Sequence, residues 1–168
     1  MRNKIFRVLI LIIMFSFLYA CQQKKNNLDI KKTIKRGMTI DGLKEGVWIE
    51  YDDKGNVKRI KNYKKGKLHG GHVSFYPDGS IYSFGSYTNG VSNGPSVLFF
   101  SNQNINVQDN YKNGLLNGFS NLYGKNGNLK QSFFYLNNKK EGYQYYLDEF
   151  TGDTIKIERY KKGIKSKN

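Results

Sequence analysis

A pair of glycines four residues apart returns every 24 residues along most of this chain. The pairs are Gly42 with Gly46, Gly66 with Gly70, Gly90 with Gly94, and Gly114 with Gly118, and Asn138 with Gly142 continues them in weaker form. Tyrosines keep the same period at Tyr63, Tyr87, Tyr111 and Tyr135, and Tyr160 follows one residue late. A fixed period of this length indicates a repeat array, in which each unit is one small supersecondary structure.

Each unit consists of two β-prone segments separated by a short turn. In the first unit, residues 46–51 and 57–63 flank a turn that contains Gly55, which is a hairpin pattern. The third unit has Gln103 where the turn glycine is expected, and the fifth carries an insertion near Phe150. No window keeps apolar residues at a period of 3.6, so we expect no helix. The sequence predicts an all-β fold, a single elongated and twisted sheet built as a meander of antiparallel hairpins.

The glycines have a conformational purpose in this prediction. Tight turns need positive φ, which glycine adopts freely and asparagine tolerates. We therefore expect the second glycine of each pair to be a structural turn residue; this set is Gly46, Gly70, Gly94, Gly118 and Gly142.

Alternation along the strands predicts two different faces. Val47, Ile49 and Tyr51 share one face, and Val73 with Phe75 continue it. The opposite face carries a mostly polar column formed by Trp48, His72, Ser96, Ser120 and Gln144. One unit cannot bury its apolar side alone, so we expect the stability to come from stacking of units.

The first 20 residues predict an export signal. Arg2, Lys4 and Arg7 precede an apolar stretch that is too short for a bilayer span of about 20 residues. The stretch ends in Leu-Tyr-Ala before Cys21, the only cysteine, and this resembles a bacterial lipobox. The resemblance implies cleavage before Cys21 and attachment of acyl chains such as palmitate. An ordinary secretory signal and an uncleaved anchor are the alternatives.

The predicted segments follow from these patterns. Residues 1–20 are the lipoprotein signal peptide, 21–38 a flexible cationic tether, 39–163 the repeat array of about five units, and 164–168 a basic tail. The lysines of the tether could lie against anionic head groups, or the tether could be a solvated spacer. Residues 35–40 fall where a half-repeat would place its second strand, and could cap the array.

One unit is similar to a known repeat family. The spacing Gly-x-Trp-x-x-Tyr over residues 46–51, the turn Gly55-Asn56 and the returning Tyr63 with Gly66 resemble the MORN repeat. The resemblance is closest to the bacterial 24-residue variant labelled YwqK-family antitoxin. It covers about residues 40–163 and implies an elongated antiparallel meander. Only the first unit keeps the tryptophan.

No pattern of catalytic or metal-binding residues emerges. His69 and His72 are three residues apart, but a metal site would need further ligands nearby, so surface histidines are expected. The acid pairs Asp52-Asp53 and 148–149 fall at predicted turns, where adjacent carboxylates do not face each other as glycosidase chemistry requires. We therefore expect no enzyme, no cofactor and no metal.

The strongest functional cue is the combination of aromatic side chains with a basic sheet, the formal net charge of the chain being +15. Such a surface could stack on sugars, hold a peptide or attract anionic partners. Nucleic acid fits the charge, but an exported lipoprotein seldom meets it, so none is expected. The candidate binding surface consists of Trp48, Tyr51, Phe75, Tyr76, Phe99, Phe100 and Tyr123. A purely structural role for these aromatic residues is the alternative.

The leading functional hypothesis is a membrane-anchored, non-enzymatic binding or scaffold lipoprotein that contacts a protein or an envelope component. An immunity or antitoxin-like protein that neutralises an exported toxin is the second hypothesis, and an envelope hydrolase is a weaker third. Gln22 after Cys21 favours the outer over the inner membrane, by resemblance to enterobacterial sorting rules. The sequence fixes neither the leaflet nor the oligomeric state.

Overall fold

The computed structural model describes residues 35–167. The chain divides into one unit of residues 1–33 and a second of residues 34–168, and the description below concerns the second unit. The predicted signal peptide, Cys21 and most of the predicted tether lie outside the described residues. No helix in the described part of the chain is long and apolar enough to cross a membrane.

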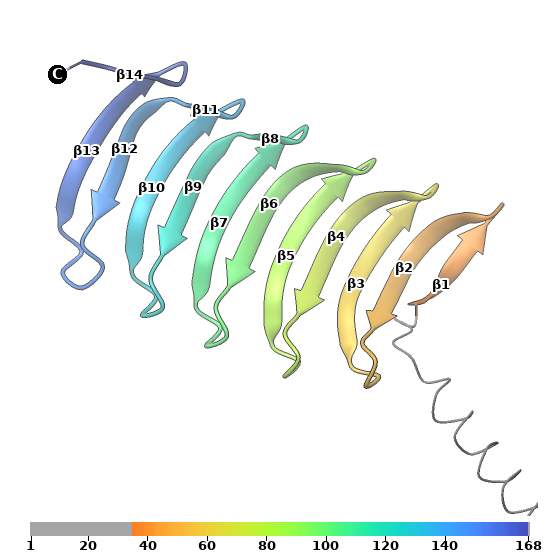
Figure 1. The fold of residues 1–168 in the computed structure, drawn as a ribbon. Coiled ribbons are helices and arrows are strands. Elements are labelled where there is room, and N and C mark those ends of the chain that lie inside the picture. Colours follow the sequence, from red (N-terminus) through yellow and green to blue (C-terminus); the bar gives the residue numbers. More distant parts are fainter. Residues whose placement is uncertain (1–34, 168) are drawn as a thin grey trace, which may run out of the picture. The chain divides into compact units, whose positions relative to one another are not determined.

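All 14 strands belong to one sheet in which every pairing is antiparallel and neighbours follow the chain order. Figure 1 shows the hairpins side by side in one row, and the predicted all-β meander is confirmed. The strands are β1 (Lys35–Ile40), β2 (Leu43–Tyr51), β3 (Val57–Lys64), β4 (Lys67–Phe75), β5 (Ile81–Thr88), β6 (Val91–Phe99), β7 (Ile105–Lys112), β8 (Leu115–Leu116), β9 (Gly118–Tyr123), β10 (Leu129–Leu136), β11 (Lys139–Lys140), β12 (Gly142–Leu147), β13 (Thr154–Lys161) and β14 (Ile164–Lys165).

Two-residue turns connect successive strands at one end of the hairpins, and we call them the short turns. In each, both central residues have positive φ, as at Asn89 (52°) and Gly90 (87°), which a type I′ hairpin turn requires. The first glycine of most pairs lies here. From the second short turn onward, each turn also bonds to the preceding repeat: the amide of Gly66 donates to the carbonyl of Lys44, and that of Gly90 to the carbonyl of Leu68.

The second glycine of each pair does not lie in a turn, which corrects the prediction for this set. Gly46, Gly70 and Gly94 lie inside β2, β4 and β6, and Gly118 and Gly142 begin β9 and β12. All five have positive φ, between 66° and 114°. They lie beside register irregularities, such as the one between Lys61 and Tyr63 in the pairing of β3 with β4. Positive φ is therefore used at β-bulges rather than at chain reversals.

The array extends beyond the predicted boundaries at both ends. β1 begins at Lys35, inside the predicted tether, and pairs with β2 as the second strand of a half-repeat. β14 lies in the predicted basic tail and pairs with β13 through Tyr160 and Lys161. Both short strands continue the repeat register of their neighbours, which is why they extend the sheet.

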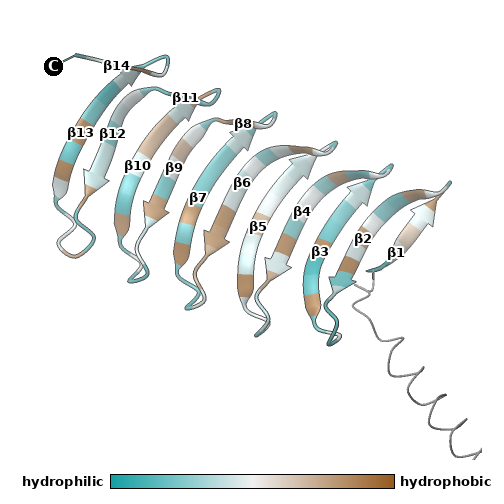
Figure 2. Cartoon of the chain, viewed as in Figure 1, coloured by the Kyte–Doolittle hydropathy of each residue, from teal (hydrophilic) through white to brown (hydrophobic). Residues whose placement is uncertain are grey.

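The two faces of the sheet differ in chemistry. One face, which we call the tyrosine face, carries a column of five tyrosines, because each lies two residues from the strand partner of a residue in the predicted polar column. The tyrosines are Tyr63, Tyr87, Tyr111, Tyr135 and Tyr160. The other, which we call the apolar face, carries Val47, Ile49, Val73, Val97 and Phe119. Figure 2 shows hydrophobic and hydrophilic positions alternating along the strands.

No hydrophobic side chain among the described residues is fully buried, and the buried side chains are polar: Glu50, Ser74, Gln144 and Glu158. All four lie on the tyrosine face. The amide of Gln144 accepts a hydrogen bond from the backbone N–H of Phe134 and donates to the carbonyl of Glu141. Each of these four side chains takes part in hydrogen bonds, as buried polar groups generally do.

Candidate ligand-binding crevice at the first long turns

Five longer turns connect the strands at the opposite end of the hairpins from the short turns. We call them long turns 1 to 5; they span residues 52–56, 76–80, 100–104, 124–128 and 148–153. In the first four, the first residue donates its amide to the carbonyl of the fifth, as Asp52 does to Asn56. The fourth residue has positive φ, and Gln103 (66°) takes this conformation in place of glycine.

Asparagine side chains bridge long turns 3, 4 and 5. Nδ2 of Asn102 and Nδ2 of Asn104 both donate to the carbonyl of Lys125, at 2.7 and 2.8 Å. One repeat later, Asn126 and Asn128 donate in the same way to the carbonyl of Glu149. Each bridge fills the space between two successive turns and gives one carbonyl two donors.

Long turns 2 and 3 are bridged differently. The side-chain amide of Gln103 accepts from the backbone N–H of Ile81 at 3.1 Å and donates to its carbonyl at 3.1 Å. The residue that departs from the glycine pattern thus replaces the asparagine bridge. Its side chain reaches back to the preceding repeat.

Long turns 1 and 2 have no such bridge among the described residues. The counterparts of Asn102 and Asn104 are Lys54 and Asn56, and Nδ2 of Asn56 donates instead to Asp52 of its own turn, at 3.1 Å. The space between these turns is open. A Cβ built on Gly79 would meet nothing within 4 Å, whereas one built on Gly127 would lie 3.5 Å from Asn104.

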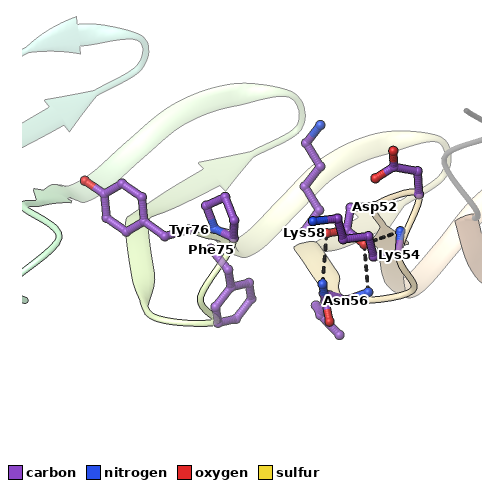
Figure 3. A pocket seen from close by; sticks show the side chains of 9 residues that line it. Asp52, Lys54, Asn56, Lys58, Phe75 and Tyr76 are labelled. Atoms are coloured by element: carbon purple, nitrogen blue, oxygen red, sulfur yellow. Dashed lines mark hydrogen bonds between the residues drawn. The ribbon is translucent and has the colours of Figure 1, made fainter.

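The open space forms a crevice of about 420 Å³, shown in Figure 3. Two further hollows of about 290 and 410 Å³ adjoin it, and all three share Phe75 and Pro77. In Figure 3 the ring of Tyr76 points away from long turn 1; its hydroxyl donates to the carbonyl of Phe99 at 2.7 Å. The main crevice is lined by Asp52, Asp53, Lys54, Asn56, Val57, Lys58, Phe75, Tyr76 and Pro77.

The charged groups of the crevice are balanced and have different roles. Oδ1 of Asp52 accepts from the amides of Lys54 and Asn56, so this carboxylate holds the turn. Although desolvation raises the pKa of Asp52, the hydrogen bonds from Asn56 and Lys54 outweigh it and hold the pKa below its usual range. Lys54, Lys58 and Asp53 form no ion pair with a described residue. These three side chains are available to a ligand.

The predicted aromatic surface is divided by the structure. Tyr51, Phe75, Phe99 and Tyr123 form one row on the apolar face, each near the start of a long turn. Tyr76 and Phe100 begin long turns 2 and 3. Trp48 lies on the tyrosine face, where its ring contacts Tyr63 edge-on at 6.3 Å. Of the seven residues, only Phe75 and Tyr76 line the crevice.

Lys54, Asn56 and Lys58 were not predicted as site residues. Their signal is present in the repeat alignment: asparagines stand at the third and fifth positions of long turns 3 and 4, but lysine stands at the third position of long turn 1. A break in the asparagine pattern marks the place where the bridge is missing. Finding it requires knowing that these asparagines reach across to the next turn.

The other candidate chemical groups lie apart from the crevice. His72 lies on the tyrosine face beside Tyr87, and His69 lies in the bulge that contains Gly70. No group of three or more His, Cys, Asp or Glu side chains that could hold a metal occurs in residues 35–167. Asp148 accepts from the amides of Phe150 and Thr151, so, like Asp52, it holds a turn.

Comparisons with known proteins place the chain in no family. No protein-family model matches the sequence, and no curated protein matches it. Among solved structures, a mutant of S. aureus TarM in complex with fondaparinux, alpha-GlcNAc-glycerol and UDP matches at a TM-score of 0.41 and 16% identity, over 73% of this chain. A crystal structure of TarM matches at a TM-score of 0.40 and 16% identity, over 72% of this chain. This chain spans 23% of the length of each.

Proposed function

We propose that this protein is a lipid-anchored, non-enzymatic binding or scaffold module of the bacterial cell envelope, built from MORN-type repeats. The observation that carries the proposal is the apolar face, which has no second layer over it in residues 35–167. Val47, Phe119 and Ile157 lie on this face and remain 54%, 53% and 55% exposed. Exposed apolar side chains along one uncovered face are typical of an interaction site.

The arrangement of the sheet supports a protein or an envelope component as the partner. Phe119 and Phe134 contact edge-on at 5.2 Å on the apolar face, and Tyr143 with Tyr145 extends the aromatic surface. Aromatic side chains are enriched in interface centres because they bury a large area at a low cost in conformational entropy. Burying apolar area contributes about 25 cal/mol per Å².

The anchor is part of the proposal. Acylation of Cys21 after removal of residues 1–20 would hold the array at the membrane, and the outer membrane is favoured. Burial of lipid chains contributes about 0.8 kcal/mol per CH₂, so two or more chains give stable attachment. In this proposal the tether gives the array access to a partner near the membrane.

Site-specific photo-crosslinking in living cells tests the proposal. A photoreactive amino acid at Phe119 samples the apolar face, and one at Lys156, whose side chain is 56% exposed, samples the tyrosine face. We expect one dominant crosslinked partner from position 119 and none from position 156. Mass spectrometry identifies the partner.

A Cys21→Ser variant is the control for anchoring. We expect this variant to leave the membrane fraction and to lose the crosslink from position 119. Crosslinks only to abundant envelope proteins, equal at both positions and unaffected by Cys21→Ser, would argue against a dedicated partner. Retention of Cys21→Ser in the membrane fraction would argue against the lipid anchor.

A further inference from the structure

We propose that the crevice between long turns 1 and 2 binds a neutral saccharide. This site lies at the long-turn end of the hairpins, away from Phe119 on β9, and meets the apolar face at Phe75. The proposal stands on the missing bridge between these turns, on an apolar wall beside it, and on the balance of charge around it.

The missing bridge leaves an acceptor for a ligand. The carbonyl of Pro77 is the counterpart of the Lys125 and Glu149 carbonyls, each of which takes two amide donors from the preceding turn. Pro77 receives no such donor from the described residues, because Asn56 is held by Asp52. A ligand with neighbouring O–H or N–H donors would take the place of the two amides. Neighbouring hydroxyl groups are the common feature of sugars.

The wall of the crevice supplies an apolar surface. Phe75, Val57 and Pro77 line it, and Phe75 belongs to all three adjoining hollows. The C–H face of a pyranose ring packs on such a surface, while its hydroxyl groups face the polar rim. A volume of about 420 Å³ is within the range of about 300–1,000 Å³ for small-molecule sites.

The charge of the rim favours a neutral ligand over an anion. Lys54 and Lys58 are matched by Asp52 and Asp53 among the lining residues, so the rim has no net formal charge. Asp52 is occupied by the turn, which leaves two ammonium donors and the Asp53 carboxylate acceptor. Alternating donors and acceptors suit the hydroxyl groups of a sugar, which serve in both roles.

The strand pairing argues against a peptide at this place. Adding a strand to an open sheet edge is one recurring way in which extended peptides bind. Here β3 is paired with both β2 and β4, and β4 with both β3 and β5, so no free strand edge lies beside the crevice. A peptide would have to bind here without adding a strand to the sheet.

Saturation-transfer NMR with the full-length protein, in a detergent without a sugar head group, tests the proposal. The probes are cellotetraose, maltotetraose and tetra-N-acetylchitotetraose, all neutral, with tetra-alanine as the peptide. We expect at least one tetrasaccharide to bind and tetra-alanine not to bind. Chemical-shift changes on titration give the affinity.

A double variant that restores the asparagine bridge, and so fills the crevice, is the strongest test of the proposal. Asp52→Gly with Lys54→Asn reproduces the Gly124, Asn126 and Asn128 arrangement of long turn 4, releasing Asn56 to bridge to Pro77. We expect saccharide binding to weaken at least tenfold. Phe75→Leu tests the wall independently, and Phe99→Leu, at the same position one repeat later, is its matched control. Phe75→Leu should weaken binding and Phe99→Leu should not.

The outcomes separate the alternatives. Weakening in the closure variant and in Phe75→Leu, with Phe99→Leu unchanged and circular dichroism preserved, supports the proposal. Binding of none of the three saccharides, equal affinity in all variants, or preference for tetra-alanine overturns it. Because the partner surface is tested by crosslinking from Phe119, either proposal can fail without the other.

Discussion

Trp48 occupies the space above Gly37 on the neighbouring strand: a Cβ built on Gly37 would overlap Cδ2 of the indole ring. The indole N–H donates to the carbonyl of Met38 at 3.1 Å, which fixes the ring across β1. Nζ of Lys44 lies 4.7 Å from the Trp48 ring and 4.6 Å from the Tyr63 ring. The only tryptophan of the chain therefore ties the first strand of the array to the second and third.

Gly37→Ala should destabilise this end of the array. The added methyl group must displace the ring, and overpacking of this kind costs about 1–3 kcal/mol. Urea unfolding followed by Trp48 fluorescence measures the loss. Gly71→Ala is the matched control, since its Cβ would lie 3.6 Å from Phe84, an ordinary contact. Equal stability of Gly37→Ala and the native protein would show that the ring can move without cost.

Gln103 has an unfavourable positive φ, but its side chain makes two hydrogen bonds to Ile81. Two substitutions separate the effects of the backbone conformation and of the hydrogen bonds on stability. Gln103→Ala keeps the positive φ and loses the two hydrogen bonds to Ile81, at about 0.5–1.5 kcal/mol each. Gln103→Gly loses the same bonds but relieves the conformational cost, so we expect it to be more stable than Gln103→Ala by about 1 kcal/mol. Urea unfolding of both variants measures the difference.

The contrary result is also informative. If Gln103→Ala is as stable as the native protein, the bridge between long turns 2 and 3 contributes nothing. In that case the asparagine bridges of the later turns would need separate measurement before the missing bridge at long turn 1 is given weight.

The repeat period predicted the sheet and its order because glycine spacing, turn residues and strand alternation all repeat at 24 residues. It could not place the second glycines in bulges, since a positive φ suits a turn and a bulge equally. It could not find the crevice either, because that depends on whether Asn56 bonds to Asp52 or across to the next turn. The position of the second glycines and the partner of Asn56 both depend on contacts with neighbouring strands and turns, which the local sequence does not show.

The extra residue in the fifth unit is accommodated in a turn, so that the strands keep their pairing. Tyr160 pairs with Gly142, as Tyr63 pairs with Gly46, although Tyr160 comes one residue late. The additional residue lies in long turn 5, where Asp148 donates its amide to the carbonyl of Asp153, and Phe150 is 80% exposed. A turn accommodates an insertion that a strand could not, because a one-residue slip would exchange the two faces.

Glu158 should make stability depend on pH. Hydrogen bonds from Lys156 and Lys165, aided by those from Tyr146 and Tyr160, hold the pKa of Glu158 far below its ordinary value of 4.5. A lowered folded-state pKa means that this stabilisation is present above pH 4.5 and is lost as the pH falls through the folded-state value. Glu158→Gln should therefore be less stable than the native protein at pH 7, with the gap narrowing below pH 4.5.

Urea unfolding at a series of pH values checks this prediction. Glu149→Gln is the control, because Glu149 pairs with Lys130 at a more exposed position. We expect a small effect of that substitution at every pH. A gap between Glu158→Gln and the native protein that stays constant down to pH 3 would contradict the assigned role of the carboxylate.

His72 should titrate below its ordinary pKa of 6.5. Burial is the largest cause, and the positive charges of Lys61 and Arg59 add to it, against a smaller opposite effect of Glu50. Because the folded state favours neutral His72, stability should decrease as the pH falls below 6.5 toward the folded-state pKa. NMR titration of the full-length protein measures the pKa, with His69→Gln used to assign the resonance. Lys61→Gln should raise the pKa of His72, and Lys64→Gln, at the exposed end of β3, should leave it unchanged. A His72 pKa at or above 6.5, or one insensitive to Lys61→Gln, would mean that the tyrosine face admits enough water to screen these charges.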